Sequence, residues 1–115
     1  MKYRNPNKYG NQKTMVDGIY FDSAIEARRY KELKLMEKAG LISDLQLQVP
    51  FEVIPKIKDE KTNKVLQRPT IYKSDFTYRK EGKLVVEDAK GYQTEAYKIK
   101  RKLMFWRFGI HIQEV

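Results

Sequence analysis

The sequence predicts an α/β fold in the order β-hairpin, helix, three strands, helix, strand. Two stretches, 23–40 and 94–109, have the 3.6-residue spacing of apolar side chains typical of amphipathic helices, and each begins with Ser or Thr and ends at Gly. The segments between them are rich in β-branched and aromatic residues, which favour strands. Strands on both sides of the second helix imply a crossover and at least one parallel pair, so we expect a mixed central sheet flanked by helices.

Composition narrows the class of protein. The formal net charge is +9 and there are eight tyrosines, which favours a polyanionic partner, most simply nucleic acid; a merely soluble basic protein is the alternative. Cysteine is absent and His111 is the only histidine, so thiolate and multi-histidine metal sites are excluded. No apolar run approaches the roughly 20 residues of a membrane span, and the N-terminus lacks a signal peptide's apolar stretch, so we expect a cytoplasmic protein.

The chain divides into a short arm and one domain. Residues 1–13 are polar and basic without periodicity, which predicts a flexible basic arm that either settles on a phosphate backbone or stays disordered. Residues 14–115 form the domain, which is long enough for a single core. It begins with a small hairpin, because Asp17-Gly18 between two apolar triplets is a strong two-residue turn signal.

The first helix carries an acid with two interpretations. Ser23 and Glu26 match the capping-box pattern, and Gly40 ends the helix after Ala39. Glu26 also shares a helix face with Tyr30 and Leu33, at i+4 and i+7, so its carboxylate can reach over the sheet. Capping and a functional role remain compatible.

The three middle strands include an exposed hairpin. Residues 41–55 alternate between apolar and polar side chains, with Pro50 placing a bend or bulge. Residues 56–68 are charged, and we expect an exposed tip whose charges are solvated. The next hairpin, Ile71–Arg79 and Leu84–Gly91 around a turn at 80–83, carries Asp75 in mid-strand and Asp88 near its end.

The second helix, capped by Thr94, has a predicted inward stripe and a basic side. The stripe is Ala96, Ile99, Leu103 and Trp106. The basic side, together with the helix entrance, gives the nucleic-acid-binding candidates Lys98, Arg101, Lys102, Tyr92 and Gln93. Residues 110–115 alternate as a last strand.

In chain order, a helix with Glu, a strand with Asp, a strand ending in acid-x-Lys and a basic helix resemble the PD-(D/E)XK nuclease superfamily. The closer resemblance is to small phage proteins described as endonuclease-like or Holliday-junction-resolvase-like, and it covers roughly residues 20–115. Its motifs here are Phe21-Asp22-Ser23 with Glu26-Ala27, then Ser74-Asp75-Phe76, then Val86-Glu87-Asp88-Ala89-Lys90-Gly91. Asp-x-Lys alone occurs by chance, whereas the ordered set is more specific. The superfamily's Pro-Asp is Ser74-Asp75 here. The resemblance implies a restriction-endonuclease-like αβββαβ core.

The resemblance also implies roles for individual residues. Asp75 and Asp88 would bind Mg²⁺ or Mn²⁺, with the Ala89 carbonyl as a third ligand and Glu26 completing the set directly or through water. Lys90 would orient or activate the attacking water. Glu87 is the rival of Asp88, but strand alternation points it to the face opposite Lys90, so we assign Asp88 and expect Glu87→Gln to be mild.

The implied function is that of a Mg²⁺-dependent DNA endonuclease, selective for junctions or branched DNA, in phage DNA recombination or processing in the bacterial cytoplasm. A protomer of this size presents one site, so cutting both strands implies a homodimer. The alternatives are a non-catalytic nucleic-acid-binding module and an assembly factor that keeps a nuclease fold without turnover.

Overall fold

The computed structural model describes residues 13–89 and 93–115, so almost all of the predicted N-terminal arm lies outside the described residues. The helices in these ranges are α1 (Ala24–Lys38) and α2 (Glu95–Phe108). The strands are β1 (Thr14–Val16), β2 (Ile19–Phe21), β3 (Ser43–Leu47), β4 (Pro50–Ile54), β5 (Ile57–Lys58), β6 (Val65–Gln67), β7 (Thr70–Lys73), β8 (Phe76–Lys80), β9 (Lys83–Asp88) and β10 (Gln113–Glu114).

The central sheet is mixed, as predicted. Its strand order is β10-β9-β8-β3, with β10 parallel to β9 and the other pairs antiparallel. The turn between β8 and β9 is also at the predicted place, because Glu81 and Gly82 both have positive φ angles, as a two-residue hairpin requires. The last strand is shorter than the predicted 110–115 and consists of Gln113–Glu114 alone.

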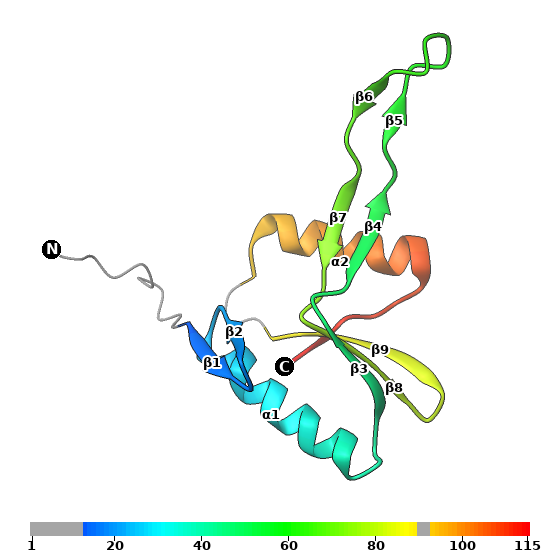
Figure 1. The fold of residues 1–115 in the computed structure, drawn as a ribbon. Coiled ribbons are helices and arrows are strands. Elements are labelled where there is room, and N and C mark those ends of the chain that lie inside the picture. The colour runs from blue at the N-terminus through cyan, green and yellow to red at the C-terminus, as the bar shows by residue number, and fades with distance from the viewer. Residues whose placement is uncertain (1–12, 90–92) are drawn as a thin grey trace, which may run out of the picture.

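Each helix covers a different face of the strands that run through the centre (Figure 1). The α1 side has one core cluster, which includes Leu33, Phe76 and Tyr78. The α2 side has a second cluster, which includes Tyr72, Val86 and Met104. Since neighbouring residues of one strand point to opposite faces, the strands β8 and β9 contribute to both cores. The caps are those expected: Ser23 and Thr94 accept the backbone N–H groups of Glu26 and Tyr97.

The prediction that residues 71–79 form one strand with Asp75 at its middle was wrong. The chain is strand in β7 and again in β8, with Ser74 and Asp75 in the break between them. The facing chain breaks at the same place, between β3 and β4, where Gln48 has a φ of 55°. Backbone bonds still join the two breaks: the Gln48 N–H donates to the Asp75 carbonyl at 3.1 Å, and the Ser74 N–H to the Val49 carbonyl at 2.9 Å. The two strands therefore kink together, and β4 and β7 leave the central sheet.

The inward stripe predicted for α2 was also wrong. Ile99 and Trp106 are 58% and 77% exposed, and Ala96 is exposed too, whereas the buried residues of the helix are Tyr97 and Met104. Leu103 is half-buried beside that cluster. The apolar positions of this helix outnumber the places in the core, so periodicity alone selected a neighbouring face.

Beyond the kink the paired strands continue outward as a long ribbon. β4 pairs with β7, and β5 pairs with β6 at the end that projects from the body (Figure 1). The exposed hairpin predicted for residues 56–68 is thereby confirmed. The principal extents of the molecule are 51 × 49 × 24 Å. Within the described ranges, neither helix has the length and apolar character needed to cross a membrane.

Candidate functional site

The kink in the ribbon places Asp75 beside the end of β9. The last pair of the β8–β9 register is Phe76 with Glu87, so Asp75 lies one step beyond it, next to Asp88. Its Oδ2 atom accepts a hydrogen bond from the Ala89 N–H at 2.8 Å. This bond joins the carboxylate from one strand to the backbone of the residue that follows Asp88. Asp75 is half-buried, so one side of it remains open to solvent.

Asp88 lies at the C-terminal end of β9, on the α2 side, and its side chain is fully buried. Its Oδ2 atom accepts a hydrogen bond from the Tyr72 hydroxyl at 2.6 Å. Burial, followed by this hydrogen bond, raises the pKa of Tyr72 well above its ordinary value, so the phenol stays a neutral donor. Tyr72 therefore fixes the position of the Asp88 carboxylate. Sequence patterning did not identify Tyr72, because a tyrosine in a strand is ordinary.

Glu26 approaches the same end of the sheet from α1. Its backbone N–H donates to the Ser23 hydroxyl at 3.1 Å, while its buried carboxylate accepts from Gln48 Nε2 at 3.0 Å. Since the Gln48 backbone also binds the Asp75 carbonyl, one residue at the kink contacts both acids. Both interpretations of Glu26 thus have a structural basis: its backbone takes part in the cap, and its side chain turns toward Asp75.

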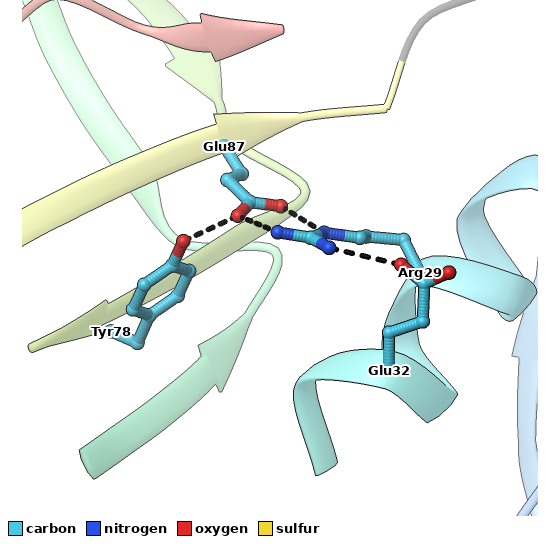
Figure 2. A network of polar contacts seen from close by, with 4 residues as sticks. All are labelled: Arg29, Glu32, Tyr78 and Glu87. Carbon is cyan, nitrogen blue, oxygen red and sulfur yellow. Dashed lines mark hydrogen bonds and ion pairs between the residues drawn. The ribbon is translucent and has the colours of Figure 1, made fainter. Parts of the chain in front are cut away.

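Glu87 lies on the face opposite Asp88, as strand alternation predicts, and it takes part in a buried polar network (Figure 2). Its two carboxylate oxygens accept from Arg29 Nε at 2.8 Å and Nη2 at 2.6 Å, and Oε2 also accepts from the Tyr78 hydroxyl. The hydrogen bond with Glu87 raises the pKa of Arg29, and burial raises the pKa of Tyr78 to about 12. Arg29 follows Glu26 by one helical turn, so this ion pair ties the helix that carries Glu26 to the strand that carries Asp88.

A groove of about 550 Å³ adjoins these acids between β7 and the start of α2. It is lined by Ile71, Tyr72, Lys73, Thr94, Ala96, Tyr97 and Lys100. Two lysines and the N-terminal end of a helix favour an anion there, because the ammonium groups and the helix dipole act in the same direction. Neither Lys73 nor Lys100 was among the candidates from sequence, since their convergence depends on the kink that turns β7 toward α2.

The basic residues predicted on α2 separate into two groups. Lys98 and Lys102 are exposed, and Lys98 makes a 3.3 Å surface ion pair with Glu95. Arg101 instead pairs with Glu114 of β10 at 2.6 Å, and its guanidinium also donates to Gln93 at 3.3 Å. Glu114 accepts the Tyr97 hydroxyl as well, at 2.5 Å, which lowers the pKa of that carboxyl. Arg101 and Gln93 are therefore held in an internal contact between α2 and β10. Lys90 and Tyr92 lie outside the described residues.

The donors at this end of the sheet fit a hard divalent cation in kind. Asp75 and Asp88 supply carboxylate oxygens, and Mg²⁺ is commonly bound by one or two carboxylates plus waters and substrate phosphates. Within residues 13–89 and 93–115 there is no group of three or more His, Cys, Asp or Glu side chains placed to hold a metal ion. The described site is therefore a carboxylate pair, with Glu26 reaching toward it through Gln48.

The fold and the site define a mixed α/β protein in which acids from separate elements meet at one end of the central sheet. Residues 6–113 match the model of the DUF1064 family, described as a protein of unknown function. Because this match spans nearly the whole chain, the protein belongs to the DUF1064 family. No curated protein and no solved structure matches the chain. An account of its activity therefore depends on the site itself.

Proposed function

We propose that this protein is a metal-dependent endonuclease that hydrolyses DNA phosphodiester bonds, with junctions or other branched DNA as its substrate and a homodimer as its working form. The observation that carries the proposal is the hydrogen bond from the Ala89 N–H to the Asp75 carboxylate, because it brings an acid from one strand to the side of Asp88 on the next. With the resemblance to PD-(D/E)XK nucleases, this pair supports a cation site rather than an incidental cluster of acids.

Each residue of the site has a defined task in this proposal. Asp75 and Asp88 would hold Mg²⁺, with Glu26 and the Ala89 carbonyl as further ligands. When bound, the cation supplies a Lewis acid for the phosphate and lowers the pKa of a coordinated water. Tyr72 orients the Asp88 carboxylate through its 2.6 Å hydrogen bond. Lys90 would orient or activate the water, as the sequence motif implies.

The groove beside the acids gives the phosphate backbone a place to bind. Lys73 and Lys100 line it together with Thr94, the cap of α2. Cations here would neutralise the phosphates on either side of the scissile bond and position the strand over Asp75 and Asp88. Exposed Lys98 and Lys102 would extend this surface along α2.

A cleavage assay with a matched pair of variants tests the proposal. Four-way junction, flap, nicked, single-stranded and duplex DNA are each incubated with Mg²⁺ or with EDTA. Wild type is expected to cleave at least one branched substrate with Mg²⁺ only. Asp75→Asn should lose that cleavage, while Asp44→Asn, the same change at an exposed strand residue, should retain it. Equal cleavage by the two variants would exclude the proposed site.

A second candidate is a nucleic-acid-binding module without turnover. It is favoured by the complete burial of Asp88 and its bond with Tyr72, an arrangement that also suits a purely structural acid. In that case wild type binds these DNAs with micromolar or tighter affinity but cleaves none of them at any Mg²⁺ or Mn²⁺ concentration.

A further inference from the structure

The outer end of the ribbon has no core of its own. We call residues 54–71 the distal ribbon; within it, all residues from 54 to 68 are exposed except Asp59. The projection contributes to a radius of gyration of 17.1 Å, against about 13 Å for a compact chain of this length. A two-stranded ribbon alone is only marginally stable in water. Its maintenance as an extended feature points to a surface that it contacts.

The charge of the distal ribbon indicates what that surface is. The segment has five basic residues, Lys56, Lys58, Lys61, Lys64 and Arg68, against Asp59 and Glu60. Asp59 is used locally, since its Oδ1 accepts the Lys61 N–H at 2.9 Å in the turn. In the described part of the chain, none of the four lysines takes part in a salt bridge, whereas cations of the body, such as Arg29 and Arg101, have acidic partners. Uncompensated lysines on a projecting ribbon complement a polyanion.

The dimensions of the ribbon favour duplex DNA as that polyanion. A two-stranded ribbon fits the major groove, which is about 12 Å wide. The run from residue 54 to the tip is on the order of 25 Å at the rise of a strand, somewhat less than one helical turn of DNA. The ribbon also exposes Ile57, Val65 and Leu66, by 49%, 51% and 59%. Such aliphatic groups can contact thymine methyl groups in the groove.

We propose that the distal ribbon is a second DNA-binding element, which enters the major groove of the duplex next to the position that is cut. The inference rests on the proposed function for its ligand. β7 connects the ribbon to the site directly, because it carries Tyr72 and Lys73 and ends at the kink that holds Asp75. A duplex held by the ribbon thus continues toward the groove lined by Lys73 and Lys100.

The test compares two variants that lose the same charge. The ribbon variant replaces Lys56, Lys58, Lys61 and Lys64 by Gln, and the control replaces Lys31, Lys38, Lys80 and Lys83, which are exposed on the body. Binding to a 40-bp duplex is measured by fluorescence anisotropy in EDTA at several salt concentrations. The slope of log K against log salt should fall by about 1 for each lysine that touches a phosphate, so by about 2 to 4 in the ribbon variant. The control should change by less than 1, and both should keep the wild-type melting temperature.

Equal slopes for the two variants would overturn the proposal. So would an unchanged slope combined with a loss of self-association in sedimentation velocity, because the ribbon would then bind a second copy of the chain. The binding is measured without metal, so it is independent of hydrolysis. Ribbon-dependent binding without cleavage by wild type would refute the nuclease alone, and cleavage with ribbon-independent binding would refute the ribbon alone.

Discussion

Removal of Arg29 is expected to destabilise the protein severely, because it leaves the Glu87 carboxylate in the interior without its cation. Glu87 has no exposed surface, and the Arg29 side chain is only 22% exposed. Breaking a buried pair from one side costs about 3–5 kcal/mol. With an unfolding entropy of about 2.1 cal/mol/K per residue, this corresponds to a fall in Tm of roughly 12–20 °C for a chain of 115 residues. That loss is a large share of a typical domain's stability.

The reverse change should be less costly. Glu87→Gln leaves the positive charge on Arg29, which already pairs with Glu32 at 2.9 Å near the surface. The expected cost is about 1–3 kcal/mol, chiefly for the weakened bonds to Arg29 and Tyr78. This replaces the expectation of a mild effect, which followed from the sequence alone and held only for the metal site. Glu32→Gln is the control, since its carboxylate is 52% exposed and a surface pair contributes under about 1 kcal/mol.

Urea unfolding followed by far-ultraviolet circular dichroism measures these differences. Trp106 fluorescence is a poor probe, because that side chain is 77% exposed in the folded protein. The predicted order of destabilisation is Arg29→Ala, then Glu87→Gln, then Glu32→Gln. If Arg29→Ala costs no more than Glu32→Gln, the buried pair does not hold α1 to β9.

Other parts of the site give independent predictions. The pKa of Tyr78 is raised from its ordinary 10.0 to about 12, so its stabilisation is complete below pH 10 and is lost as pH rises toward 12; Tyr78→Phe should flatten urea stability in that window, and an unchanged curve would contradict this. Joint replacement of Lys98 and Lys102 by Ala should lower the salt slope of DNA binding by about 1–2, and no change would place the DNA elsewhere. Lys90→Ala should keep DNA and metal binding but lose most cleavage; loss of binding instead would make it a ligand-holding residue.

Local signals in the sequence predicted most of the elements. The caps at Ser23 and Thr94, and the glycines that end both helices, act through contacts within a few residues, so pattern alone located them. The parallel pair of β10 with β9 followed from the strand–helix–strand order. Alternation along β9 also separated Glu87 from Asp88 correctly.

What the sequence did not predict depends on long-range packing. The kink at Ser74–Asp75 requires a matching break at Gln48, 26 residues earlier, and no local signal couples the two. The partners that fix the acids are equally distant: Arg29 lies 58 residues from Glu87. The face of α2 that is buried was chosen by tertiary contacts, which favoured Tyr97 and Met104 over the predicted stripe.

The central claim is that Asp75 and Asp88 share a divalent cation, and the most direct test is the Tm of the protein as Mg²⁺ or Mn²⁺ is added. A cation at 100 times its dissociation constant stabilises by about 2.7 kcal/mol, or roughly 10 °C in a domain of this size. We expect a rise of that order for wild type and for Asp44→Asn, and none for Asp75→Asn or Asp88→Asn, each compared with its own metal-free Tm. An equal rise in all four proteins would contradict the proposed metal site.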